Sequence, residues 1–165
     1  MQKKYWKFLV QLRSSIEFLD LYYEASYRKD RFINIVLAIA SSASIATWAI
    51  WKQYTFIWAT IIAFAQIVAV IKPFLPYHLR IEYIPTFTRE AYKLFVACER
   101  EWFNVASGNL KEKEINTLLF GFKERYVLIE TGLIKCKTLP KNKKIHTIAD
   151  NNTTEYFCKN YSEGG

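Results

Sequence analysis

Charged and apolar positions divide the chain into three parts. Residues 32–71 carry one charged side chain, Lys52, in forty positions. Residues 1–31 hold seven basic and four acidic side chains, and residues 72–165 hold fifteen basic and eleven acidic ones. At ~1.5 Å per helical residue, the uncharged runs Phe32–Trp51 and Gln53–Ile71 are each about long enough to cross the ~30 Å hydrocarbon core of a bilayer. The pattern therefore predicts a hairpin of two transmembrane helices with a short turn at Lys52.

Aromatic and basic side chains mark the two ends of the predicted hairpin. Amphipathic rings prefer the interface between lipid and water, and basic residues are retained on the cytoplasmic side. We therefore predict that both termini lie in the cytoplasm and that the turn lies outside. The competing interpretation is a pair of buried helices in a soluble all-α protein. The predicted membrane-interface residues are Trp48, Trp51, Tyr54, Trp58 and Lys72.

Apolar residues at three- and four-residue steps predict helices on both sides of the hairpin. The first runs from near the N-terminus to about Arg31 and is continuous with the first span. After a break at Pro73 and Pro76, a helix follows Pro85 and ends at Ser107-Gly108. Asn109, with Glu112 three residues later, predicts the N-cap of a further helix through Ile129. In the basic tail, Asp150-Asn151-Asn152 is typical of a turn.

The predicted fold class is therefore an all-α membrane protein. It would consist of a long N-terminal amphipathic helix, a two-span transmembrane hairpin and a small cytoplasmic helical layer. The predicted segments are a cytoplasmic amphipathic helix (1–31), the hairpin (32–75), cytoplasmic helices (76–134) and a basic C-terminal tail (135–165).

The sequence contains few candidates for catalysis. His78 and His146 have no second ligand at metal-binding spacing, and the three cysteines are spaced far beyond C-x-x-C. Phosphate-binding and hydrolase motifs are missing from the sequence. We therefore predict that the protein is not an enzyme and uses no metal and no cofactor.

A net charge of +8 favours an anionic partner. Lysines beside a membrane attract anionic lipid, whereas a lysine-rich tail with nearby aromatic residues can also contact nucleic acid. Both interpretations stay open. The candidate contacts to a partner or to nucleic acid are Lys135, Lys137, Lys141, Lys143 and Lys144.

The layout resembles the SLATT group of two-transmembrane effectors. The resemblance covers roughly residues 5–130 and depends on the N-terminal amphipathic helix, the entry Tyr27-Arg28-Lys29-Asp30-Arg31, the stretch 41–52 and the exit Ile71-Lys72-Pro73-Phe74-Leu75-Pro76-Tyr77. Such proteins occur beside bacterial nucleotide-signalling and anti-phage systems, and similar ones are encoded beside retron reverse transcriptases. The resemblance implies a partner, either a reverse transcriptase with its RNA and DNA or a nucleotide-signalling sensor.

The resemblance also implies a function. The leading expectation is an effector that forms homo-oligomers and disrupts the inner membrane, which causes growth arrest or cell death. The alternative is a membrane-anchored scaffold or regulatory subunit that docks a cytoplasmic partner or a nucleoprotein complex through its helical, basic tail. If the protein is an effector that disrupts the membrane, membrane lipid is one of its partners.

Polar residues within the apolar runs are candidates for helix association. Asn34, Ser41 and Ser42 share one side of the first predicted span, and Gln66 lies at a similar depth in the second. Helices in lipid associate through small and polar residues. These four side chains would either join the two spans of one chain or line a seam or wet path between subunits.

Overall fold

The structure is a computed structural model in which every described secondary-structure element is helical. It describes the backbone of residues 1–50, 55–74, 77–131 and 142–161, and the side chains of these residues except 40–50, 55, 58 and 77–79. The helices are α1 (Gln2–Ile50), α2 (Thr55–Ile71), α3 (Tyr77–Ala106), α4 (Glu112–Thr131) and α5 (Lys143–Tyr161), with a short 3₁₀ helix η2 (Lys72–Phe74). The chain divides into two units. Unit 1 comprises Met1–Glu24 and Glu82–Gly165, and unit 2 comprises Ala25–Ile81.

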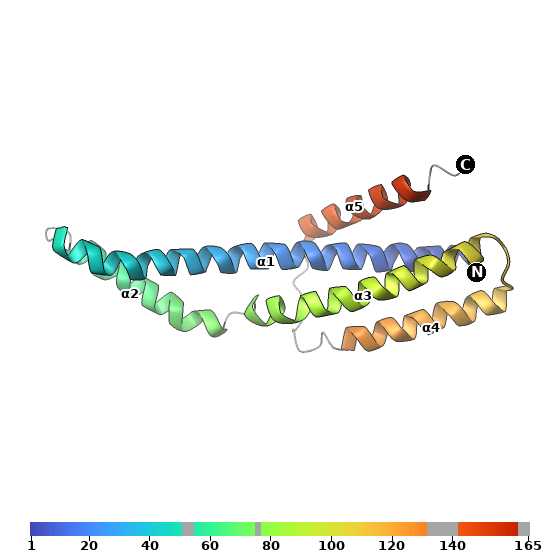
Figure 1. Ribbon diagram of the computed structural model, residues 1–165, viewed down its shortest axis with the longest axis horizontal. Coiled ribbons are helices and arrows are strands. Elements are labelled where there is room, and N and C mark those ends of the chain that lie inside the picture. The colour runs from blue at the N-terminus through green and yellow to red at the C-terminus, as the bar shows by residue number, and fades with distance from the viewer. Residues whose placement is uncertain (51–54, 75–76, 132–141, 162–165) are drawn as a thin grey trace. The chain divides into compact units, whose positions relative to one another are not determined.

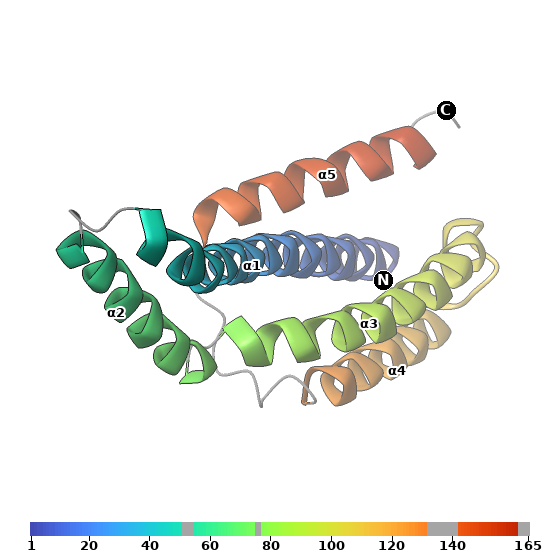
Figure 2. The same cartoon turned by 60° about the vertical axis from the view of Figure 1, so that its left-hand side comes forward.

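Unit 1 is a four-helix bundle in which α1 and α3 lie side by side. The Tyr5 hydroxyl donates to the Cys98 carbonyl over 2.8 Å, and the Gln2 side-chain amide donates to the Val105 carbonyl over 2.8 Å, so α3 runs antiparallel to α1. Ser14 donates to Asp150 over 2.7 Å, which places α5 on another side of α1. Figures 1 and 2 both show α4 beside α3 and α5 beside α1.

The core of unit 1 is built from the apolar stripes that the periodicity predicts. Along α1 and α3 these side chains recur at three- and four-residue steps, and each helix therefore buries one face. Aromatic pairs join the helices, such as Tyr5 with Phe122 of α4 at 6.2 Å between ring centroids. The least exposed core side chains are Tyr5, Leu9, Ile84, Ala91, Phe95, Cys98, Val105 and Ala149.

The helix ends differ in part from the predicted ones. Gly108 has φ 73°, which ends α3 where the sequence predicted. The predicted N-cap at Asn109 is wrong, because α4 begins later and the Lys111 N–H donates to the Glu114 side chain over 2.7 Å. Pro85 lies inside α3 and not before it.

The predicted turn at Asp150-Asn151-Asn152 is also wrong, because these residues lie within α5. Short polar side chains favour turns by local hydrogen bonding. Here Ala149, Thr153 and Phe157, at four-residue steps, are buried against the other helices of unit 1. Tertiary packing of this stripe therefore overrides the local preference.

The predicted two-span membrane protein is contradicted. Within the residues that the structure describes, no helix is both long enough and apolar enough to cross a membrane. The described residues of α2 are Thr55–Ile71, which are 17 in all. In the predicted first span, Phe32–Trp51, side chains are described only for residues 32–39.

Two matched valines test which surfaces form the core of unit 1. Val105 is fully buried, whereas Val127 on α4 is 54% exposed. Val105→Ala should lower the free energy of unfolding by about 2 kcal/mol, because it removes two buried methyl groups and leaves a cavity. Val127→Ala should change it by less than about 0.5 kcal/mol. Urea unfolding followed by circular dichroism measures both, and equal losses would contradict this core.

Candidate functional site

Unit 2 exposes many large apolar side chains. Phe56 is 85% exposed, Phe74 84% and Phe32 68%. Isolated exposed apolar residues are ordinary, but many large ones on two neighbouring helices indicate an interaction surface. We name it the apolar hairpin surface, formed by Phe32, Ile35, Val36, Ile39, Phe56, Ile57, Ile61, Phe64, Ile67, Val70, Ile71 and Phe74.

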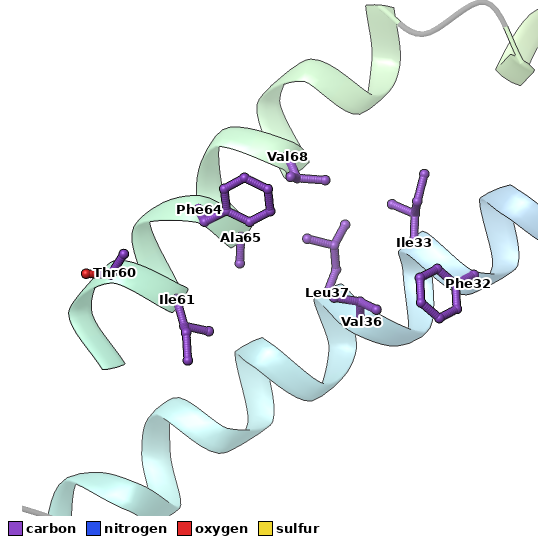
Figure 3. Close-up of a pocket in the computed structure, with 9 residues that line it drawn as sticks. All are labelled: Phe32, Ile33, Val36, Leu37, Thr60, Ile61, Phe64, Ala65 and Val68. Carbon is purple, nitrogen blue, oxygen red and sulfur yellow. The ribbon is translucent and has the colours of Figure 1, made fainter. Parts of the chain in front are cut away.

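An apolar groove of about 480 Å³ lies between α1 and α2 within unit 2. Figure 3 shows its side chains arranged on the two facing helices. Thr60 is the one hydroxyl among its lining residues, and it already donates to the Phe56 carbonyl over 2.9 Å. The groove can therefore hold a hydrocarbon chain or an apolar side chain by contact alone. Its lining residues are Phe32, Ile33, Val36, Leu37, Thr60, Ile61, Phe64, Ala65 and Val68.

A small polar cluster ties η2 to α1 inside unit 2. The Asn34 side-chain amide donates to Asp30 over 2.8 Å, and the Lys72 ammonium donates to the Asn34 side-chain oxygen. Lys72 also lies 3.6 Å from the Asp30 carboxylate, with both side chains about three-quarters buried. The cluster holds the end of the hairpin by charge and hydrogen bonding.

The structure gives the predicted seam residues different roles. The hydrogen bonds of Asn34 go to Asp30 and Lys72, and Gln66 is exposed on α2. The side chains of Ser41 and Ser42 lie outside the described residues. The seam between spans or subunits therefore stays a prediction.

The predicted interface and contact residues are described only in part. Lys72 is ion-paired with Asp30. Lys143 and Lys144 are exposed in the first turn of α5, which the Asn142 side chain caps by accepting the Lys144 N–H over 3.1 Å. The others lie outside the described residues or side chains, namely Trp48, Trp51, Tyr54, Trp58, Lys135, Lys137 and Lys141.

Unit 1 contains a charged and aromatic cluster that sequence reasoning missed. Arg13 lies 2.5 Å from Glu17, and its guanidinium carbon lies 4.4 Å from the Tyr156 ring centroid. The same guanidinium lies 5.5 Å from the Phe95 ring centroid. Cation–π attraction strengthens when the cation is shielded from water. Arg13 therefore links α1 to α3 and α5.

Glu99 accepts hydrogen bonds from two tyrosines of α5. The Tyr156 hydroxyl donates over 2.7 Å and the Tyr161 hydroxyl over 2.9 Å. Burial, followed by the hydrogen bond to Glu99, raises the pKa of Tyr156 to about 12 and also raises the pKa of Tyr161. Glu99 of α3 therefore holds α5. The four-residue stripe of α5 could have revealed that this helix packs on the bundle, but not that it contacts Glu99.

The described side chains include one histidine, His146, and the cysteines Cys98 and Cys158. Among the residues described, no three His, Cys, Asp or Glu side chains lie close enough to hold a metal ion. His146 stacks on Phe18 at 4.0 Å between ring centroids. Burial raises the pKa of the Cys98 thiol to about 11, which keeps it protonated near neutral pH. His78 lies outside the described side chains.

Comparison of the chain with known protein families, curated proteins and solved structures found no match. The resemblance to the SLATT group therefore stays a prediction.

Removing the Tyr156 hydroxyl should reduce the loss of stability in alkali. The pKa of Tyr156 is about 12 in the folded state against an ordinary value of 10.0. A pKa raised by folding stabilises the protein below the ordinary value, and this contribution is lost as the pH rises towards the folded value. The free energy of unfolding should therefore fall between about pH 10 and 12 in the wild type, and fall less in Tyr156→Phe.

Urea unfolding at several alkaline pH values measures this difference. Tyr27→Phe is the control, because Tyr27 is 48% exposed and lies in unit 2. Identical pH profiles for the wild type and Tyr156→Phe would contradict the role given to Glu99.

Proposed function

We propose that the protein is a non-catalytic effector of bacterial anti-phage defence, which acts as an oligomer on the inner membrane. The apolar hairpin surface is its working part and contacts lipid at the membrane surface. The observation that carries the proposal is the number of large apolar side chains that unit 2 leaves exposed. The effector class follows from the resemblance in layout to the SLATT group.

Lipid is the partner that best matches this surface chemically. The groove between α1 and α2 offers hydrocarbon and no available hydrogen-bond donor among its lining side chains. Arg28, Lys29 and Arg31 are exposed one turn before Phe32. Apolar side chains enter the boundary between headgroups and acyl chains, and each nearby basic residue adds about 1 kcal/mol of attraction to anionic lipid.

Self-association follows from the same exposure. In water, a surface of this kind drives molecules to bury it against one another. Oligomers that form on lipid would concentrate apolar helices in one area of the bilayer. Such crowding is the proposed cause of membrane damage.

Two phenylalanines of similar exposure test the lipid contact. Phe64 in the hairpin is 67% exposed, and Phe103 in unit 1 is 73% exposed. Phe64→Gln should weaken binding to phosphatidylethanolamine–phosphatidylglycerol vesicles by about tenfold, because it removes one large apolar contact. Phe103→Gln should leave binding unchanged. Vesicle co-sedimentation and release of an entrapped dye measure binding and damage.

The proposal fails if the wild-type protein neither binds nor permeabilises these vesicles. It also fails if Phe64→Gln and Phe103→Gln have equal effects, because the contact would then be non-specific. Vesicles of phosphatidylcholine alone separate the apolar contribution from the charge contribution.

A second candidate function is docking of a polyanionic partner, such as a nucleoprotein complex, through α5. Lys143 and Lys144 occupy the first turn of this helix, where the macrodipole is already positive. Two cations at this end of the helix destabilise it slightly. Because they do not serve helix stability, we infer that they serve binding. This function would leave partner binding unaffected by Phe64→Gln and make it strongly salt-dependent.

A further inference from the structure

The outer flank of α4 combines opposite charges with a depression. Glu114, Leu118, Gly121 and Arg125 lie within about 60° of one another on the helix, because each residue turns by ~100°. Glu114 and Arg125 are exposed, whereas Gly121 is half-buried, and Leu118 packs partly against the core of unit 1 and is partly exposed. The flank lies beside the face that buries Ile115, Leu119 and Phe122.

Nothing in the described chain requires a glycine at position 121. Glycine destabilises a helix interior relative to alanine, and it is usually retained for a positive φ or a close approach. The described glycine with positive φ is Gly108, and no described atom lies within 4 Å of a Cβ built at Gly121. The missing side chain therefore leaves an open depression on the surface of α4.

A groove of about 360 Å³ between α3 and α4 adjoins this flank. Its apolar floor includes Leu94 and Ala97 of α3 with Leu128 and Ile129 of α4. Leu128 is 71% exposed. A helix that packs along the flank would cover Leu128 as well as the depression at Gly121.

When two copies of this flank lie antiparallel, each residue faces one of complementary charge or shape on the other copy. A two-fold axis midway between residues 119 and 120 places position 114 of one antiparallel helix opposite position 125 of the other, and position 118 opposite 121. Glu114 then faces Arg125, and Leu118 enters the depression at Gly121. Glu114 uses its Oε2 atom to accept the Lys111 N–H, so Oε1 can accept from the partner copy's arginine.

We propose that this flank of α4 pairs antiparallel with the same flank of a second copy of the chain. A surface whose charges and shape match its own reversed order is suited to a two-fold dimer, in which each contact occurs twice. The proposed function requires an oligomer, and the pairing supplies one. The biological use of the pairing therefore rests on the proposed function. It involves unit 1 and not the apolar hairpin surface.

The experiment is sedimentation velocity of the full chain in a non-ionic detergent, over a range of protein concentrations. The wild type should form a dimer. Gly121→Leu should weaken dimerisation by about tenfold or more, because it fills the depression that receives Leu118. Lys123→Leu is the control, since it places the same leucine on the other side of α4 and should leave the dimer intact.

Charge exchange tests the proposed orientation. Arg125→Glu should weaken the dimer, and the double variant Glu114→Arg with Arg125→Glu should restore it. Circular dichroism shows whether each variant remains helical. A monomeric wild type, a dimer insensitive to Gly121→Leu, or a double variant no tighter than Arg125→Glu would overturn the pairing.

Lipid binding and pairing can fail separately. Loss of vesicle binding in Phe64→Gln with an unchanged dimer supports both proposals. If the wild type does not bind vesicles, the proposed function is contradicted. The dimer measurement then still tests the pairing of α4 by itself.

Discussion

Two helices can bury only the surfaces that face each other, and this limit explains the difference between the two units. In unit 1, four helices enclose one core, so Tyr5, Ile84 and Cys98 are fully buried. In the described part of unit 2, α1 and α2 are apolar on more than one side. Phe56 and Val70 consequently remain exposed, at 85% and 67%. Unit 2 therefore needs a further surface to cover it, which is the basis of the proposed function.

Polar contacts determine how α5 joins unit 1. The helix buries few side chains, and only Phe157 among Ala149, Thr153 and Phe157 is large. Hydrogen bonds to Glu99 and the stacking of Arg13 on Tyr156 supply the remaining specificity. Contacts of this kind favour one position of a helix, because the buried polar groups lose their partners elsewhere. The attachment of α5 should thus respond to charge changes more than that of α4.

Hydrophobic periodicity predicted the buried faces of unit 1. The stripes containing Leu9 and Ile16 in α1, Leu94 in α3 and Leu119 in α4 are confirmed as core. Periodicity could not show whether lipid or protein covers an apolar segment, because the same apolar side chains suit both. The predicted spans are therefore wrong for the described chain, in which no helix is both long and apolar enough to cross a membrane.

The candidate site was less predictable than the core. Exposed apolar residues such as Phe64 lie in the run that the sequence marked as lipid-facing, but the Asp30–Asn34–Lys72 cluster needs the turn geometry of η2. The bonds of Glu99 join residues 57 and 62 positions apart, and local patterns carry no information on such pairs. Long-range polar contacts of this kind follow only from the fold.

Hydrogen exchange of the full chain, with and without phosphatidylethanolamine–phosphatidylglycerol vesicles, tests most directly whether unit 2 carries the function. The account predicts that vesicles slow amide exchange in α2, because lipid covers the apolar hairpin surface. Exchange in the buried part of α3, around Ala91 to Cys98, should stay unchanged, because unit 1 already has its own core. Slower exchange in unit 1 with no change in α2 would contradict the account.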